Sequence, residues 1–373
     1  MSMITNQPAK MGSYSEDDVL FLLKDLSTIQ LEDSTVNREM RVQSGQHYSE
    51  SLPIEYQPPK EYVDLFWQTA NEYKSKVALC VGIVAEQIYR NKGNQSILVS
   101  LARAGTPVGI LIKRYIQSRY GISLPHYSVS IIRDRGIDEN ALHFILKKHP
   151  KGNIQFVDGW TGKGAISLEL TKACQQFEKI YQIQLDDQLA VVADPGHCTT
   201  VFGTREDFLI PSACLNSTVS GLVSRTVLND TYIGKIDFHG AKYYRELLPS
   251  DVSNDYIDLI AGEFSAISEE AERIVLQRVH QEIHAEFVGM QDVKTIQAEF
   301  NIGSTNYIKP GVGETTRVLL RRVPWKILMR DPSSPYVKHI LMLAEEKGVE
   351  VEIFPDMNYL CMGLIKSVKE TSK

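Results

Sequence analysis

A glycine-rich turn between an expected strand and an expected helix constrains this chain more than any other feature. The stretch begins at Asn153 with an apolar run, passes Asp158, and carries three glycines before Ala165. Apolar residues then recur at helical spacing over 166–177, which predicts a helix with one buried stripe. Backbone N–H groups at the start of such a helix point together, and the helix dipole adds to their attraction for anions. The sequence therefore predicts a phosphate site at 158–164.

The side chains of this turn suit a sugar phosphate. Thr161 adds a hydroxyl donor, Lys163 adds a charge, and Asp158 can accept hydrogen bonds from sugar hydroxyls. A Walker A loop does not fit, because Val157 holds its first glycine position, and the glycine spacing also misses the dinucleotide fingerprint. The stretch resembles the phosphoribosyl-diphosphate (PRPP) loop of type I phosphoribosyltransferases. That resemblance assigns PRPP contacts to Asp158, Gly159, Thr161, Gly162, Lys163 and Gly164, with Gly159 replacing the second acid of the family.

A second turn of the same kind follows an expected strand at 96–101. It resembles the pyrophosphate loop of the same transferases, which implies diphosphate contacts for Ala102, Arg103, Ala104, Gly105 and Thr106. Another expected strand, at 128–132, leads into Arg133 and Arg135, where the family carries a mobile catalytic loop. Guanidinium groups stay ionised and bind phosphates bidentately, although a solvated charge run is the alternative. The resemblance implies catalytic roles for Arg133, Arg135 and Asp158, with Mg²⁺ bound through Asp158.

The last part of the chain, 302–373, has an α-β-α-β pattern and carries a net charge of +3, against −9 for the first 301 residues. This contrast favours a polyanion partner for the tail. The pattern resembles the L7Ae/Pelota RNA-binding fold, in which a glycine turn opens the first helix and contacts RNA. The resemblance implies RNA contacts for Gly313, Glu314, Arg317 and Arg321. The alternative is a docking module with a basic face.

Composition sets the class of protein. Of the 373 residues, 43% are hydrophobic and 23% are charged, as in ordinary globular proteins, and no apolar run reaches the ~20 residues of a membrane span. Five cysteines without CxxC spacing, together with an N-terminus that lacks a signal-peptide pattern, predict a cytoplasmic protein. We expect an α/β fold: an N-terminal helical arm (1–60), a type I phosphoribosyltransferase-like parallel sheet core (61–301) and a Pelota-like domain (302–373). Other expected elements are helices at 19–26 and 61–89, a strand at 209–215 and a linker at 303–313.

Taken together, the two halves resemble the phosphoribosyltransferase–Pelota fusion family found beside tellurium-resistance (ter) genes, also labelled cysteine protease StiP. The resemblance covers nearly the whole chain, and its recurrent stretches are 43–50, 157–164 and 313–317. It implies transfer of phosphoribose from PRPP to a base or related acceptor in a stress response. Such a reaction needs positioning and stabilisation of the departing diphosphate rather than a protein nucleophile.

Two other functions remain open at this point. The missing acid at Gly159 favours a PRPP or nucleotide sensor without turnover, with RNA bound by the tail. The protease label implies Cys198 or Cys214 as nucleophile with His197 or His239 as base. Cys214 lies in the expected apolar strand, which favours a core position. No membrane partner is expected, and homo-oligomerisation is compatible with the sequence.

Overall fold

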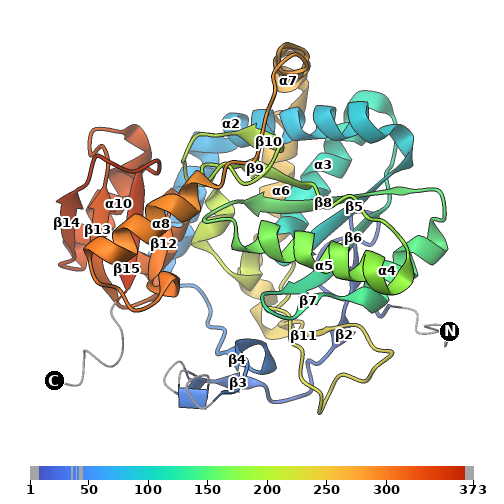
Figure 1. Cartoon of the computed structure of the whole chain (residues 1–373), viewed down its shortest axis with the longest axis horizontal. Coiled ribbons are helices and arrows are strands. Elements are labelled where there is room, and N and C mark those ends of the chain that lie inside the picture. The colour runs from blue at the N-terminus through green and yellow to red at the C-terminus, as the bar shows by residue number, and fades with distance from the viewer. Residues whose placement is uncertain (1–7, 35–36, 39, 42–44, 366–373) are drawn as a thin grey trace.

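The computed structural model describes residues 8–34, 37–38, 40–41 and 45–365. Figure 1 shows a core built on one large sheet, a smaller C-terminal part beside it, and an N-terminal segment that runs below both. In the part of the chain described, no helix combines the length and the apolar character needed to cross a membrane. Gln43 and Ser44, which belong to one of the recurrent stretches, lie outside the described residues.

The core sheet confirms the expected parallel α/β architecture. Its strand order is β1-β6-β5-β8-β9-β10, every neighbouring pair in that order is parallel, and β7 pairs with β6 in the antiparallel sense. The central strands are apolar almost throughout because helices cover both faces of the sheet. The bounds are β1 Leu20–Leu22, β5 Ser96–Ala102, β6 His126–Ile132, β7 Gly136–Ile137, β8 Asn153–Trp160, β9 Leu189–Ala193 and β10 Val201–Thr204.

Helices cover the two faces unequally. α2, α3, α6 and α7 pack together on one face, and α4 and α5 cover the other (Figure 1). α2 continues for 33 residues and ends where Gly93 adopts a positive φ of 61° and its N–H bonds to the Tyr89 carbonyl, as the glycine predicts. The bounds are α2 Lys60–Lys92, α3 Gly105–Tyr120, α4 Glu139–Lys148, α5 Ala165–Tyr181, α6 Ser253–Ala261 and α7 Phe264–Arg278.

The expected helix at 19–26 is wrong, because this stretch forms strand β1 and the short strand β2. Phe21 and Leu23 belong to the apolar cluster on the α2 side of the sheet, whereas Leu22 belongs to the cluster on the α5 side. Successive side chains of a strand point to opposite faces, so burial on both sides favours extended backbone. Tertiary packing here overrides a helical spacing read over only a few residues.

The expected strand at 209–215 is also wrong, since this stretch forms the 3₁₀ helix η3. Pro211 occupies the first turn of η3 and has no N–H for a strand ladder. The remaining short elements are β2 Lys24–Asp25, β3 Glu32–Asp33, β4 Leu52–Pro53, β11 Gly240–Ala241, η1 Tyr48–Glu50, η2 Gly93–Gln95, η3 Pro211–Cys214, η4 Ser217–Val219 and η5 Arg245–Ser250.

The C-terminal part has its own four-stranded sheet in the order β12-β15-β13-β14. The stretch 303–313 is not a linker, because it contains β12, which pairs with β15. α8 contributes to an apolar cluster on one side of this sheet, and α9 and α10 contribute to the cluster on the other. The bounds are α8 Val288–Glu299, η6 Thr305–Tyr307, β12 Ile308–Pro310, α9 Val312–Arg321, β13 Pro324–Met329, η7 Pro335–Val337, α10 Lys338–Glu346, β14 Glu350–Ile353 and β15 Cys361–Ile365.

A buried carboxylate of the core holds the C-terminal part in place. Asp207 accepts hydrogen bonds from the backbone N–H groups of Val312 (2.8 Å) and Leu360 (2.9 Å). Burial raises the pKa of Asp207 to about 6, while these two hydrogen bonds act in the opposite direction. Because Val312 is the first residue of α9, the contact places the start of that helix directly against the core.

Candidate functional site

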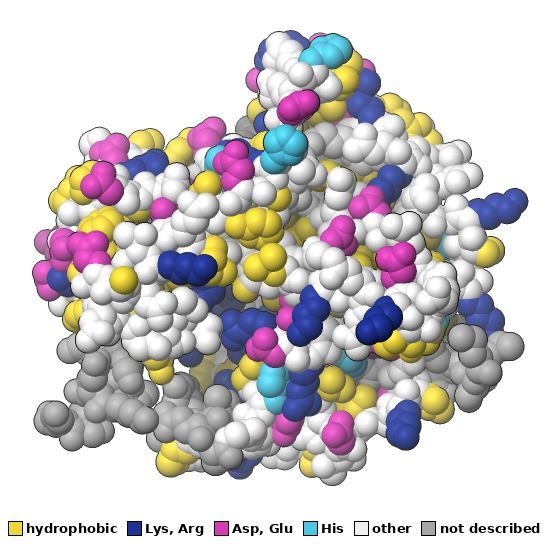
Figure 2. Space-filling view, in the orientation of Figure 1, with side chains coloured by type: hydrophobic (Ala, Val, Ile, Leu, Met, Phe, Trp, Pro, Cys, Tyr) yellow, Lys and Arg dark blue, Asp and Glu magenta, His cyan; other side chains and the backbone are white. Residues whose placement is uncertain are grey.

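A cavity of about 770 Å³ lies where the core, α9 and the N-terminal segment 53–59 meet, and we call it the interdomain cleft. It opens beyond the carboxyl ends of the core strands β5, β6 and β8, which is the usual position of ligand sites in parallel sheets. Figure 2 shows Lys and Arg side chains gathered around a hollow between the two parts of the molecule. The cationic residues lining the cleft include Arg103, Arg225, Lys309, Arg317, Arg321 and Arg322.

The turn after β5 delivers one of these cations. Ala102, Arg103 and Ala104 line the cleft, and the Arg103 guanidinium donates to the Val223 carbonyl and to Asn216 Oδ1, both at 3.1 Å. The next two residues of the predicted loop do not line the cleft. Thr106 is fully buried with its hydroxyl 2.8 Å from that of Ser128. A Cβ on Gly105 would lie 2.5 Å from the Val157 carbonyl oxygen, so glycine allows α3 to start against β8.

The turn after β8 borders a second, smaller pocket of about 260 Å³ beside the interdomain cleft. Thr161, Gly162, Lys163 and Gly164 line this pocket, and Asp158 lines both. Gly164 precedes α5 with φ 84°, and a Cβ there would lie 2.6 Å from the Phe287 ring, so only glycine fits. A strand–turn–helix geometry of the expected kind therefore exists at this position.

The polar groups of this second turn have distinct environments. Burial raises the pKa of Asp158 to about 7, and its carboxylate accepts one hydrogen bond, from the N–H of Gly159 at 2.8 Å. Lys163 donates to the Thr305 carbonyl at 2.7 Å, and burial, with Lys309 acting in the same direction, lowers its pKa to about 8. Gly162 uses its carbonyl to accept from the Tyr359 hydroxyl at 2.8 Å.

Thr161 does not present its hydroxyl to the pocket. It donates instead to Asp194, a fully buried carboxylate at the end of β9. Asp194 also accepts from the N–H groups of Cys198 (2.8 Å) and Thr199 (3.2 Å) and pairs with Arg205 at 2.9 Å. These five residues form the Asp194 network, which fixes the turn at 161–164 through the hydroxyl of Thr161.

Arg133 and Arg135 do not line the cleft and instead brace neighbouring segments. Arg133 donates to Asn306 Oδ1 at 3.0 Å, and Arg135 pairs with Glu50 at 2.5 Å. Their guanidinium groups therefore already have protein partners, which differs from the mobile catalytic loop implied by the transferase resemblance. The sequence could not show this, because both partners are distant along the chain.

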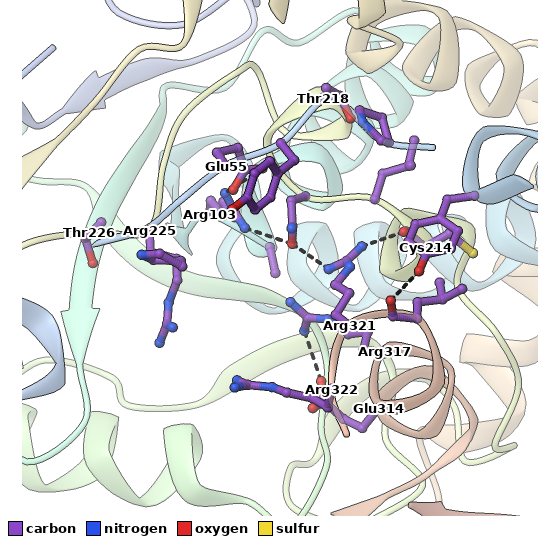
Figure 3. Close-up of a pocket in the computed structure, with 18 of the residues that line it drawn as sticks. Glu55, Arg103, Cys214, Thr218, Arg225, Thr226, Glu314, Arg317, Arg321 and Arg322 are labelled. Atoms are coloured by element: carbon purple, nitrogen blue, oxygen red, sulfur yellow. Dashed lines mark hydrogen bonds and ion pairs between the residues drawn. The ribbon is translucent and has the colours of Figure 1, made fainter. Parts of the chain in front are cut away.

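The residues expected to contact RNA lie on α9 and face the core. Arg317 pairs with Glu314 at 3.0 Å, and Arg321 donates to Asn216 Oδ1 and to the Cys214 carbonyl (Figure 3). Burial opposes the ionisation of Glu314, but Arg317 and Lys309 outweigh it and hold the pKa of this carboxyl below its ordinary value. Gly313 packs toward Trp160 of β8. The predicted RNA-contacting face is thus one wall of the cleft rather than an open surface.

Two further guanidinium groups, those of Arg225 and Arg322, face the cleft. Within the described residues, the side chains of Arg225 and Arg322 have neither an ion pair nor a hydrogen bond. The Arg225 guanidinium lies 5.4 Å from the centre of the Tyr48 ring. Although it reaches water through the mouth of the cleft, burial and the charges of Arg38 and Arg103 lower its pKa to about 10. Such a concentration of like charge favours an anionic ligand.

The cysteines, unlike Arg225 and Arg322, are almost entirely shielded from solvent. All five are buried, and burial raises the pKa of Cys198 and of Cys214 to about 12. Among the described residues no hydrogen bond joins a cysteine thiol to a histidine. His197 lies 3.4 Å from Glu286, and His239 contacts the hydroxyl of Ser130 at 2.9 Å. The two nucleophile–base pairs considered from the sequence are therefore not assembled in this structure.

The side chains at the expected magnesium site do not supply enough ligands for the ion. Asp158 is a single carboxylate, and the described residues contain no group of three or more His, Cys, Asp or Glu side chains that could hold a metal ion. Because Mg²⁺ requires an octahedral set of oxygen ligands, these residues do not fit a magnesium site held by the protein alone.

Sequence reasoning missed one residue of the cleft, Glu55, and left the role of another, Arg225, open. Glu55 lies in the N-terminal segment between two prolines, where no motif marks it. Arg225 follows a hydroxyl-rich stretch that is typical both of an anion-binding loop and of a solvated turn. Only the fold shows that both side chains face the same cavity.

Comparison with known proteins identifies two regions of the chain. Residues 12–261 match the family described as "Tellurite-like stress resistance cysteine protease StiP", and residues 287–367 match the PELOTA RNA binding domain. The chain is also 33% identical over 354 residues to a protein of Acinetobacter baylyi (strain ATCC 33305 / BD413 / ADP1) named "Cysteine protease StiP". That similarity covers 92% of this chain and 91% of the relative.

These findings confirm the expected StiP label, the link to tellurite stress resistance and the Pelota-like tail. The expectation of a PRPP-dependent phosphoribosyltransferase is wrong, because the matching family and the similar protein are both described as cysteine proteases. The family description is nevertheless that of an enzyme. This chain belongs to the StiP family and carries a Pelota RNA-binding domain at its C-terminal end.

Proposed function

We propose that the interdomain cleft binds the sugar-phosphate backbone of single-stranded RNA. Cationic side chains from both parts of the chain face this one cleft, and that observation carries the proposal. Arg317, Arg321 and Arg322 come from the region that matches an RNA-binding domain, whereas Arg103 and Arg225 come from the core. Contacts to phosphate supply most of the affinity of proteins for nucleic acids.

The size of the cleft favours a single strand over a duplex. A cavity of about 770 Å³ is in the range of small-ligand pockets, which is too small for a double helix. Single strands can also stack their bases on aromatic rings, and Tyr48 and Tyr62 line the cleft. A few nucleotides at one end of an RNA strand would fill this space.

The smaller pocket at the start of α5 is proposed to take a further phosphate of the same strand. The N-terminus of a 17-residue helix and Lys163 both attract an anion there. The raised pKa of Asp158, about 7, reduces its negative charge near neutral pH, which limits repulsion of the incoming phosphate.

Fluorescence anisotropy with a labelled single-stranded RNA tests the proposal. Replacing Arg225→Gln together with Arg322→Gln removes two charges that have no ion pair or hydrogen bond among the described residues, so folding should be little affected. We expect weaker binding and a salt dependence whose slope falls by about 0.7 for each lost phosphate contact. Arg273→Gln, on the exposed surface of α7, is the matched control. Unchanged affinity in the double variant, or equal affinity for duplex RNA, would contradict the proposal.

Cysteine-dependent peptide hydrolysis is a second candidate, favoured by the name of the similar Acinetobacter protein. Cys198 is the better placed thiol, because it lies under the turn at 161–164, with Sγ 3.6 Å from the Gly162 carbonyl. Burial raises the pKa of this thiol, and a thiolate is the reactive form, so hydrolysis requires an opening of this region. Digestion of an unfolded protein substrate by the wild-type chain, Cys198→Ser and Cys174→Ser provides the test. Activity lost only in the Cys198 variant would support this function, and wild-type inactivity would reject it.

A further inference from the structure

A carboxylate of the chain itself occupies a set of anion-binding donors at the wall of the interdomain cleft. Glu55 Oε1 accepts hydrogen bonds from the backbone N–H of Ser217 (2.9 Å) and from its hydroxyl (2.7 Å). The same oxygen lies 4.0 Å from Arg103 Nη1, and the Glu55 side chain is only 6% exposed. Figure 3 shows Glu55 beside Arg103 at the wall of the cleft.

These donors suit a phosphate at least as well as a carboxylate. A backbone N–H, a hydroxyl and a guanidinium are the groups that proteins use to contact phosphate oxygens. Arg103 does not form a direct hydrogen bond with Glu55, because its own bonds go to the Val223 carbonyl and to Asn216. At 4.0 Å the guanidinium therefore attracts the carboxylate without the bidentate geometry that fixes a permanent ion pair.

Glu55 lies on a segment with few other attachments. In the described part of the chain, the hydrogen bonds of residues 54–58 are confined to the Glu55 carboxylate. The neighbouring side chains Ile54 and Tyr56 are 40% and 71% exposed. β4 holds the segment before it and α2 holds it after. Movement of Glu55 out of the cleft thus breaks two hydrogen bonds and leaves both flanking elements in place.

We propose that Ser217 and Arg103 form a phosphate subsite, which Glu55 occupies in the free protein and which a phosphate of the ligand takes by displacing it. The proposal deepens the RNA binding proposed above, because it names a position for one phosphate of the strand. It also makes the N-terminal segment a competitor of the ligand. Ligand affinity then depends on a carboxylate that contributes no attraction to the ligand.

The experiment measures binding of inorganic diphosphate and of a single-stranded RNA to the full chain by calorimetry. Glu55→Gln keeps the size of the side chain and removes the competing charge, so diphosphate should bind about tenfold more tightly. Glu61→Gln, at an exposed position in the first turn of α2, removes the same charge outside the cleft and should change affinity little. Adding Ser217→Ala to the Glu55 variant should cancel most of the gain. Thermal unfolding of each variant confirms that it is folded.

The outcomes separate this subsite from the proposed function. A gain for diphosphate that depends on Ser217 supports the subsite even if RNA does not bind. Equal gains in the Glu55 and Glu61 variants, or a gain that survives Ser217→Ala, would overturn it, since general electrostatics would then explain the change. Measurable RNA binding that is identical in all variants, together with no gain for diphosphate, would leave the cleft proposal standing and reject the subsite.

Discussion

The interdomain cleft and the Asp194 network differ in how their charged groups are partnered. In the network, one fully buried carboxylate has a hydroxyl, two backbone N–H groups and an arginine as partners. In the cleft, Arg225 and Arg322 have no protein anion among the described residues, and Asp158 accepts only one hydrogen bond. Satisfied buried groups stabilise a fold, whereas unsatisfied charges in an open cavity are available to a ligand. The comparison therefore supports the proposed binding role of the cleft and indicates a structural role for the network.

The largest effect on stability is expected when the carboxylate of Asp194, at the centre of the Asp194 network, is removed. Asp194→Ala removes the ion pair of Arg205 and leaves two buried backbone N–H groups without their acceptor, so the free energy of unfolding should fall by about 3–5 kcal/mol. Urea denaturation followed by circular dichroism measures the change. Glu282→Gln, at a position whose side chain is 94% exposed, is the control. A loss of RNA affinity without a loss of stability would reverse the assignment of roles to the two regions.

A substitution at Asp158 is expected to have an intermediate effect, and it should raise the free energy of unfolding rather than lower it. Because burial raises the pKa of this carboxyl to about 7, the folded chain binds the proton more tightly than the unfolded chain. The free energy of unfolding therefore falls as pH rises from about 4 to about 7, where the unfolded and folded groups titrate in turn. Asp158→Asn should remove this penalty and stabilise the chain at pH ~8 by about 2 kcal/mol, allowing for contact with water in the cleft.

Urea denaturation at a series of pH values checks this prediction. The gain should vanish below about pH 4, where both forms are protonated. Asp230→Asn, at an exposed position, should show no such pH dependence. A destabilised Asp158 variant at high pH would mean that the carboxylate is satisfied in the way that Asp194 is.

The smallest effect is expected at the aromatic wall of the cleft. The Tyr48 ring lies 5.4 Å from the Arg225 guanidinium and 5.6 Å from that of Arg133. Tyr48→Leu removes both contacts, so RNA affinity should fall about twofold to threefold as Arg225 becomes less ordered. Tyr48→Phe keeps the ring and loses only the hydroxyl that accepts from the N–H of Arg133 at 3.0 Å. Equal losses in the two variants would assign the effect to the hydroxyl.

Local patterns predicted the elements that carry these regions. The apolar runs at 96–101 and 128–132 are strands of the parallel sheet, and Gly162 and Gly164 lie between β8 and α5 as expected. These predictions hold because a long buried strand and a glycine-rich turn depend mainly on their own residues. The predictions of a helix at 19–26 and a strand at 209–215 were wrong because each periodicity rested on few residues. Packing against distant segments decided the conformation of both stretches.

The chemistry of individual side chains was less predictable. The sequence marked Thr161, Arg133 and Arg135 as ligand contacts, yet each has a protein partner far away along the chain. Conversely, no pattern near Glu55 predicts that Ser217, which is 162 residues away in the sequence, donates a hydrogen bond to its carboxylate. Hydrogen-bond partners of this kind form only when the chain folds, so a linear pattern cannot assign them.

By itself the sequence determined a parallel α/β core, two strand–turn–helix connections and a basic C-terminal part, because hydrophobic period, glycine positions and charge are local properties. Only the tertiary structure decided that the arginines of α9 face the core and that the cysteines are buried. It also decided that the Thr161 hydroxyl donates to Asp194 rather than to a ligand. The reason is that burial and neutralisation of a charge depend on which distant segments share its surroundings, and only the packed chain brings those segments together.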